Sequence, residues 1–207
     1  MTKSRKLLVL HIAIGVVLTL IGIVGLDGIT ARYLRVSGYE GLPLFTAGTV
    51  FLDTITGKEI SKFLIGLVLI VAGLALAILP RTRRYASSVV FVGAVQLLST
   101  LVTGVSKNLF GRLRPFELLK SGDWGPEWFV DGSSFPSGHA GFYFGLFLPL
   151  AFLFPRWRWP LLVVPWFIAI ARVDANHHFI SDVGASIAIV GALTLLIAWL
   201  MRRKLNF

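Results

Sequence analysis

The sequence predicts an all-α polytopic membrane protein in which six transmembrane helices form one bundle, with the N- and C-termini in the cytoplasm. Composition is the first reason: 56% of the 207 residues are hydrophobic and 14% are charged, which is too apolar for a soluble domain of this length. The second reason is that six apolar stretches approach the roughly 20 residues needed to cross a bilayer. No long linker separates these stretches, so residues 1–207 are expected to form a single domain.

The first apolar stretch follows Lys3, Arg5 and Lys6, as in a signal peptide. Its apolar run is long and no small-residue cleavage site follows it, so we expect a retained anchor. In the fourth stretch, Gly141 and Gly145 predict a helix-packing face of small residues. The six predicted spans are Leu7–Leu26, Phe63–Leu79, Ala86–Val105, Gly138–Phe154, Trp159–Ile170 and Ile180–Met201, of which the fifth is the shortest.

Residues 27–62 form a predicted outer segment between the first two spans. Several of its residues recur at helical spacing, namely Leu44, Gly48, Phe51, Leu52 and Ile55. Two interpretations remain open for this segment. It is either a short amphipathic helix in the outer headgroup layer, able to guide a lipid substrate, or a loop packed on the bundle.

The distribution of charge predicts the orientation. If the N-terminus is cytoplasmic, all ten acidic residues fall on the outer side. The inner side receives only basic residues, namely Lys3, Arg5, Lys6, Arg81, Arg83, Arg84, Arg156, Arg158, Arg202, Arg203 and Lys204. Because this follows the positive-inside rule, the net charge of +10 indicates membrane orientation and no nucleic-acid partner. The chain has no cysteine, which excludes disulfides, thiolate metal ligands and a cysteine nucleophile.

A first polar segment, Phe135-Pro136-Ser137-Gly138-His139, runs directly into the fourth span. Pro136 and Ser137 suit the first turn of a helix, and Gly138 permits close approach to the backbone. Free N–H groups and the positive end of the helix dipole favour phosphate binding there, and His139 adds a group that titrates near neutral pH. An ordinary helix cap has the same local sequence, so the neighbouring segments decide between the two.

A second polar segment follows the third span and contains Lys107, Arg112 and Arg114. We expect Arg112, like Lys120, to extend to lipid headgroups. Lys107 and Arg114 are instead expected to face the polar segments at the other helix ends. The aromatic residues of the loop that follows are expected to anchor it at the membrane interface; these are Trp124, Trp128 and Phe129.

The third polar segment covers residues 172–182. Its His178 and Asp182 are four residues apart at the start of the sixth span, so the carboxylate and the imidazole can face each other across one turn. An aspartate that accepts a hydrogen bond from one ring nitrogen fixes the tautomer and leaves the other nitrogen as a nucleophile or base. His177 is interpreted as a neighbour of His178, and His11 in the first span as a packed or interfacial residue.

Ionisable residues gathered at the mouth of membrane helices are costly and therefore suggest a functional site. Fixed positive charge and hydrogen-bond donors for phosphate oxygens come from Lys107, Arg114, Arg172, Ser137 and Gly138. His139 would then protonate a leaving oxygen. The set fits a pentavalent phosphoryl group with one histidine on each in-line side.

A metal site is the competing interpretation. His177, His178, Asp174 and Asp182 are all possible ligands. However, three strongly basic residues in the same cluster would repel a divalent cation. We therefore expect neither a metal ion nor another cofactor.

Taken together, Lys107-x6-Arg114-Pro115, Pro136-Ser137-Gly138-His139 and Arg172-x5-His178-x3-Asp182 resemble the three-part signature of the type 2 phosphatidic acid phosphatase superfamily. That superfamily also holds the vanadium haloperoxidases and glucose-6-phosphatase. The three parts occur in the family's order with family-like spacing. One departure is Ala171, which stands where the family usually has a serine that hydrogen-bonds to the phosphate.

The resemblance implies roles for the site residues. His178 would attack phosphorus, assisted by Asp182, to give a phosphohistidine that water then hydrolyses. His139 would protonate the leaving group, and no metal ion would be needed. The phosphoryl oxygens would be bound by Lys107, Arg114, Arg172, Ser137 and Gly138.

The sequence therefore predicts a multi-pass lipid phosphatase with its active site on the outer face of a bacterial cytoplasmic membrane. Candidate substrates are a polyprenyl diphosphate, phosphatidylglycerol phosphate, phosphatidic acid or the phosphate of a lipid A-like glycolipid. A lipid-to-lipid phosphotransferase using the same site and an anion transporter remain as alternatives. Against a transporter, all polar motifs crowd one surface and no paired repeats occur. Halide oxidation is disfavoured because the site faces lipid.

Overall fold

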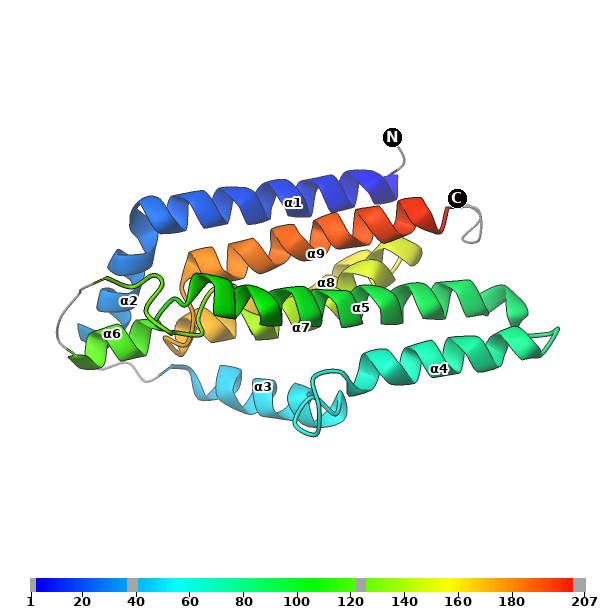
Figure 1. Ribbon diagram of the computed structural model, residues 1–207, viewed down its shortest axis with the longest axis horizontal. Coiled ribbons are helices and arrows are strands. Elements are labelled where there is room, and N and C mark those ends of the chain that lie inside the picture. Colours follow the sequence, from blue (N-terminus) through cyan, green and yellow to red (C-terminus); the bar gives the residue numbers. More distant parts are fainter. Residues whose placement is uncertain (1–2, 37–40, 122–125, 203–207) are drawn as a thin grey trace.

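The computed structural model describes residues 3–36, 41–121 and 126–202, and within these ranges all regular secondary structure is helical (Figure 1). This confirms the predicted all-α class. In chain order the helices are α1 (Lys3–Ile21), a π-helix (Gly22–Leu26), α2 (Asp27–Val36), α3 (Pro43–Ile55), α4 (Leu64–Ile78), α5 (Arg83–Phe110), α6 (Pro115–Ser121), α7 (Gly138–Leu153), α8 (Arg158–Asp174) and α9 (Ile180–Leu200).

All six predicted spans form helices, but their lengths differ. Among the described residues, three helical stretches are long and apolar enough to cross a membrane: Lys3–Leu34, Arg83–Lys120 and Ile180–Leu200. The helices α4, α7 and α8 contain 15, 16 and 17 residues, which corresponds to about 22–26 Å of helix. Helix α8 extends beyond the predicted fifth span to Asp174, and α5 extends to Phe110, so Arg172 and Lys107 both lie on helices.

Helices α1 and α9 lie side by side at one edge of the bundle (Figure 1). Glycines on the two helices permit this contact. A Cβ atom on Gly15 would lie 2.5 Å from the backbone nitrogen of Ala188, and one on Gly184 would lie 2.7 Å from that of Thr19. Small residues allow helix backbones in a membrane to approach this closely.

Helix α7 occupies the centre of the bundle, in contact with α5, α8 and α9. Most of its side chains are buried. A Cβ atom on Gly141 would lie 2.7 Å from Cγ2 of Thr103, and one on Gly145 would lie 2.9 Å from Cβ of Ser99. The predicted packing face of small residues is therefore confirmed, and it lies against α5.

The outer surface of the bundle is apolar. Large apolar side chains are exposed along α1 and α4, including Val17, Leu20, Val71 and Leu74. A soluble monomer rarely exposes contiguous apolar surface of this extent. The exposed faces of α1 and α4 are therefore suited to contact with lipid chains.

The two ends of the bundle differ in charge. Figure 1 shows both termini and the turn between α4 and α5 at one end, with α2 and α6 at the other. The first end carries the basic residues that were predicted to lie inside, for example Arg5, Arg83 and Arg158, whereas Arg203 and Lys204 lie outside the described residues. The polar segments that follow α5 and precede α7 and α9 belong to the opposite end.

The segment between α1 and α4 is more helical than expected. The π-helix joins α1 directly to α2, so helical structure continues beyond Leu26, where the first predicted span ends. Helix α3 contains the residues with predicted helical spacing, while residues 37–40 lie outside the described ranges.

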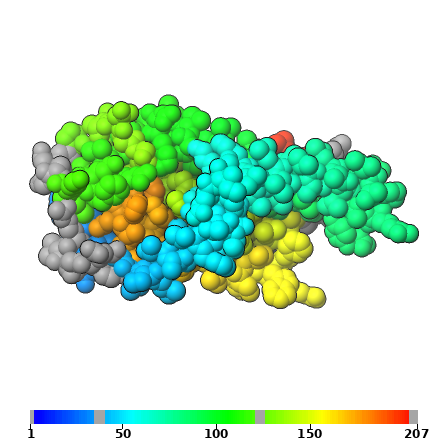
Figure 2. Space-filling model, turned by 90° about the horizontal axis from the view of Figure 1, so that it is seen from below, coloured from blue at the N-terminus to red at the C-terminus, as the bar shows by residue number. Residues whose placement is uncertain are grey.

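Helix α3 combines features of both open interpretations. A Cβ atom on its Gly48 would lie 2.5 Å from the ring of Phe167 on α8, so one face packs on the bundle. Leu44, Phe51 and Ile55, which lie at helical spacing beside Gly48, are nevertheless exposed. Figure 2 shows α3, in blue to cyan, running obliquely across the surface of the bundle and leading into α4.

The glycine contacts between α1 and α9 lead to a prediction about stability. Gly15→Ala places a methyl group against the backbone of α9, so we expect the unfolding free energy to fall by about 1–3 kcal/mol. Gly25→Ala is a matched control, because a Cβ atom there has no neighbour within 4 Å. Thermal unfolding of the purified protein in detergent measures both. Equal unfolding midpoints for the two variants would contradict the proposed close contact.

Candidate active site

Backbone hydrogen bonds bring the three polar segments together at one end of the bundle. The N–H of Ser134 donates to the carbonyl of Arg112 at 2.8 Å, and the N–H of Ser137 donates to the carbonyl of Asp182 at 3.0 Å. The hydroxyl of Ser186 donates to the carbonyl of Ser137 at 2.8 Å. The segment before α7 is thus held between the end of α5 and the first turn of α9.

Ser137 and Gly138 form the N-terminus of α7. Ser137 is the N-cap, with its buried hydroxyl oxygen 3.4 Å from the N–H of Ala140. Helix α7 therefore begins at Gly138, the first residue of the predicted fourth span, while Pro136 and Ser137 precede its first turn. Within the described residues, the N–H groups of Gly138 and His139 have no hydrogen-bond partner. Open N–H groups at the positive end of a helix dipole suit an anion.

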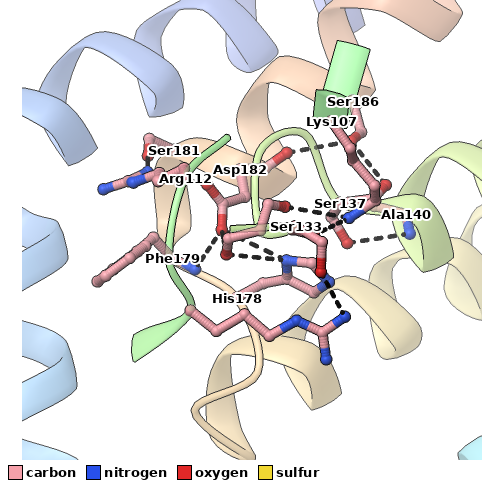
Figure 3. A network of polar contacts seen from close by, with 12 residues as sticks. Lys107, Arg112, Ser133, Ser137, Ala140, His178, Phe179, Ser181, Asp182 and Ser186 are labelled. Carbon is pink, nitrogen blue, oxygen red and sulfur yellow. Dashed lines mark hydrogen bonds and ion pairs between the residues drawn. The ribbon is translucent and has the colours of Figure 1, made fainter. Parts of the chain in front are cut away.

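His178 is buried beside Asp182, as the spacing predicts (Figure 3). Its Nδ1 lies 3.3 Å from Oδ2 of Asp182. The same carboxylate oxygen accepts hydrogen bonds from the hydroxyl of Ser134 at 2.5 Å and from the N–H of Phe179 at 2.9 Å. Because these donors hold the carboxylate in one position, Asp182 fixes the ring of His178, whose other nitrogen points away from this carboxylate.

The electrostatic environment keeps His178 neutral. Burial lowers the pKa of His178 to about 3, although Asp182 opposes the shift; Lys107 and Arg172 lower the pKa further. The pKa of His177 is likewise lowered, to about 4, mainly because the ring is buried and also because of the positive charges of Arg172 and Arg114. A neutral imidazole retains a lone pair, which a nucleophile or base requires.

Three cations of the predicted site remain without a carboxylate. Within the part of the chain that the structure describes, no Asp or Glu oxygen lies within 4 Å of the side-chain nitrogens of Lys107, Arg114 or Arg172. The Nε atoms of both arginines are buried without a hydrogen-bond partner. Lys107 Nζ donates to the backbone carbonyls of Ser133 and Ser134, beside Gly138. Positive charge collected without counterions is suited to an anionic ligand.

Arg112 is where the structure contradicts the sequence prediction. We expected this side chain to extend to lipid headgroups, but it is buried, with 0% of its surface exposed. Nη1 donates to Oδ1 of Asp182 at 2.8 Å and to the hydroxyl of Ser181 at 2.6 Å. Nη2 donates to Asp27 and Glu127, each at 2.8 Å. The planar guanidinium fork has enough donors to bind all of these groups at once, which a headgroup contact would not require.

Aromatic rings cover the guanidinium of Arg112. The rings of Trp128 and Phe179 lie 4.3 and 3.9 Å from its central carbon. Trp128 therefore packs on a buried cation, and its role as an interface anchor stays a prediction. Phe129 is exposed, and Trp124 lies outside the described residues. Lys120 is exposed, as predicted.

His139 belongs to a second polar cluster that the sequence analysis did not predict. Its Nε2 lies 3.0 Å from Oδ2 of Asp53 on α3 and 2.6 Å from Nζ of Lys58. Asp53 and Lys58 form an ion pair at 2.8 Å, and the hydroxyl of Tyr143 donates to Oδ1 of Asp53 at 2.6 Å. The carboxylate accepts a hydrogen bond from Nε2 when Nε2 carries a proton, and the ammonium donates a hydrogen bond to Nε2 when that proton is absent. Both protonation states of His139 thus have a partner.

Local sequence offers only weak signals for these additional residues. Asp53 is the one acidic residue in an otherwise apolar, helically spaced stretch, and Asp27 directly follows the first apolar run. Either position could have been flagged as an unusual charge close to a membrane segment. The motif singles out Arg114, but nothing in the local sequence indicates that Arg112 is buried among carboxylates.

The possible metal ligands are not gathered into one site. Oδ2 of Asp174 accepts the N–H of Leu42 at 2.8 Å, whereas Asp182 is bonded to Arg112 and Ser134. Among the described residues no group of three or more His, Asp or Glu side chains could hold a metal ion. His11 is buried beside Phe144 and is a packed residue, as one of the predictions had it.

Comparisons with known proteins give consistent results. The sequence model of the PAP2 superfamily matches residues 88–207. A lipid A 1-phosphatase of Rhizobium etli is 32% identical over 137 residues, which cover 61% of this chain and 58% of that protein. A lipid A 1-phosphatase of Rhizobium johnstonii is 31% identical over 139 residues, or 64% of this chain and 57% of that protein. The chain thus spans less than two thirds of the length of these relatives. No solved structure matches the chain.

Removal of Arg112 tests its role in the fold. Arg112→Gln leaves Asp27 and Asp182 buried without a cation, so the free energy of unfolding should fall by roughly 3–5 kcal/mol. Arg114→Gln is the control, because it removes the same charge from a site without carboxylate partners, and its unfolding midpoint should be unchanged or higher. Thermal unfolding in detergent compares the two. Similar losses in both variants would show that the buried ion pairs do not stabilise the fold.

The pKa of His178 predicts how stability depends on pH. Between pH 6.5 and about 3 the unfolded chain binds a proton at His178 that the folded chain does not. The free energy of unfolding should therefore fall as the pH falls through this window, by at most about 1.4 kcal/mol per pH unit for this group. Unfolding midpoints measured from pH 7 to pH 5 should decrease in the wild type and decrease less in His178→Asn. Parallel slopes would mean that His178 is not held neutral in the fold.

Proposed function

Because the chain belongs to the PAP2 superfamily, whose three-part signature its motifs resemble, we propose that it is an integral membrane lipid phosphatase. Its substrate is a phosphomonoester or diphosphate of a lipid, and the reaction proceeds through a phosphohistidine. The two relatives named as lipid A 1-phosphatases support a lipid phosphate as the substrate class. Candidate substrates are therefore a lipid A-like phosphate, a polyprenyl diphosphate, phosphatidylglycerol phosphate or phosphatidic acid.

One observation carries the proposal: a neutral histidine fixed by a carboxylate lies in the field of cations that have no carboxylate within 4 Å among the described residues. Lys107 and Arg172 both act electrostatically on His178. A phosphoryl group between them would have its negative charge balanced by the cations and its phosphorus close to the imidazole. Electrostatic stabilisation of this kind is the main contribution that proteins make to phosphoryl transfer.

The reaction then has two steps. In the first, the ring nitrogen of His178 that faces away from Asp182 attacks phosphorus, a P–N bond forms, and the P–O bond to the lipid breaks. In the second, water attacks the phosphohistidine, the P–N bond breaks, and inorganic phosphate leaves. Asp182 stabilises the positive charge that develops on His178 in the first step. The phosphoryl oxygens are bound by Lys107, Arg114 and Arg172, by the N–H group of Gly138 and by the hydroxyl of Ser137.

His139 supplies the proton for the leaving oxygen. The proton passes from the imidazole to the lipid oxygen as the P–O bond breaks, and in the second step His139 takes a proton from the attacking water. A group with this role must be stable in two protonation states. The ion pair of Asp53 and Lys58 provides a partner for each state.

Membrane orientation follows from the distribution of charge. We propose that α1, α4, α5, α7, α8 and α9 are six spans in a bacterial inner membrane, with the basic end of the bundle and both termini in the cytoplasm. The active site then lies on the outer face. Tilt and local thinning of the bilayer would accommodate the shorter helices α4, α7 and α8.

Loss of the nucleophile tests the mechanism. His178→Ala should reduce release of inorganic phosphate from a lipid phosphate in detergent on the order of 10⁴-fold or more. His177→Ala is the matched control, since the neighbouring imidazole contacts neither Asp182 nor Asp53 in the described hydrogen bonds, and it should retain most of the activity. Wild-type rates in His178→Ala would rule out this residue as the nucleophile.

The metal-independent mechanism and the acceptor of the phosphoryl group are tested in the same assay. Phosphate release should persist when EDTA is present, because Lys107, Arg114 and Arg172 supply the positive charge. Complete loss of activity on chelation would contradict the mechanism. Release of free phosphate without any acceptor lipid would separate hydrolysis from lipid-to-lipid transfer, which uses the same site.

A further inference from the structure

A cavity of about 480 Å³ adjoins His139 on the side away from α9. Its walls come from the turn between α3 and α4, from α5 and from the start of α7, and they include Lys58, Lys62, Lys107, Thr103, Gly138 and His139. This volume lies within the range of roughly 300–1,000 Å³ that is typical of small-molecule sites. In Figure 2 the segment that joins α3 and α4, in cyan, lies over this face of the molecule.

The charge of the cavity is positive. Three of its lining residues are lysines, and no acidic residue lines it in the described part of the chain. Lys58 is paired with Asp53. No described carboxylate lies within 4 Å of Lys62 or Lys107. Lys62 in particular belongs to none of the three sequence motifs and has no role in the proposed reaction.

The cavity lies on the side of the leaving group. His139 lines the cavity, whereas His178 does not. In the proposed reaction His178 attacks phosphorus from one side, and the leaving oxygen departs toward His139 on the other side. The part of the substrate that remains after loss of the phosphoryl group must therefore lie next to Lys58 and Lys62.

We propose that this cavity binds a second phosphate group on the leaving-group side of the substrate, with Lys62 and Lys58 as its cationic ligands. The inference rests on the proposed function and narrows it to lipids whose leaving group keeps a phosphate charge, such as a lipid diphosphate. For a lipid diphosphate, the P–O bond of the terminal phosphorus breaks and the bridging oxygen takes the proton of His139. The lipid monophosphate then leaves with its charge beside the two lysines. A phosphomonoester with a neutral alcohol as leaving group leaves these lysines without a ligand.

Substrate comparison tests the subsite. The ratio of kcat/KM for a polyprenyl diphosphate to kcat/KM for phosphatidic acid should exceed one in the wild type. Lys62→Gln should lower this ratio by about tenfold, because it removes one charge-assisted hydrogen bond from one of the two substrates. Lys120→Gln is the matched control, since Lys120 is an exposed lysine on α6 that does not line the cavity, and it should leave the ratio unchanged. An unchanged ratio in Lys62→Gln would overturn the proposal.

A binding measurement separates this proposal from the proposed function. Pyrophosphate should raise the thermal unfolding midpoint of the wild-type protein more than inorganic phosphate does, and Lys62→Gln should abolish the difference while Lys120→Gln keeps it. If pyrophosphate keeps its advantage in Lys62→Gln, the subsite is wrong. If the binding result holds but the wild type releases no phosphate from any lipid tested, the subsite stands and the phosphatase mechanism fails.

Discussion

The rest of the structure depends on the buried guanidinium of Arg112. A cation removed from water is tolerated only when carboxylates and other hydrogen-bond acceptors surround it. Here those acceptors come from three places in the chain: Asp27 at the start of α2, Glu127 in the loop before α7, and the adjacent Ser181 and Asp182 on α9. Each must reach the end of α5 for the charge to be balanced. The requirement fixes the first helix, the loop and the sixth predicted span relative to one another, and it explains why the π-helix after α1 turns Asp27 inward.

The same interaction separates the charges at this end of the bundle into two groups. On one side, Arg112 is neutralised by carboxylates and covered by Trp128 and Phe179. On the other side, Lys107, Arg114 and Arg172 have no carboxylate within ion-pair distance among the described residues. Asp182 lies at the boundary, since Oδ1 accepts from Arg112 while Oδ2 faces His178. Arg112 pairs with Asp27, Glu127 and Asp182, and Asp53 pairs with Lys58, so these four carboxylates do not neutralise the remaining cations. The remaining cations are therefore suited to attract a phosphoryl group in the proposed reaction.

The sequence predicts the parts of the site that depend on local spacing. Apolar length identifies all six helices of the bundle, and the interval of four residues between His178 and Asp182 brings them into contact across one turn. Local spacing could not predict that Arg112 is buried in ion pairs while Arg114 is not. These arginines are two residues apart with the same charge, and what distinguishes them is Asp27, a partner 85 residues away from Arg112 in the chain. Asp53 was missed for the same reason, since it meets His139 only after α3 has packed on the bundle. Contacts of this kind follow from tertiary packing and leave almost no trace in periodicity or motif spacing.

The position of these long-range partners indicates how the chemistry and the specificity of the site are divided along the chain. The family model begins at residue 88 and includes every residue of the three motifs. Four residues with long-range contacts precede the family model. Asp27 pairs with Arg112, Asp53 contacts His139, and Lys58 and Lys62 line the cavity beside His139. In the proposed mechanism, the part of the chain that the family model covers therefore supplies the groups that act on phosphorus. In the same proposal, the part before it holds those groups and lines the space next to the leaving oxygen. A change of substrate preference at constant chemistry would then require substitutions in the turn between α3 and α4 and none in the motifs.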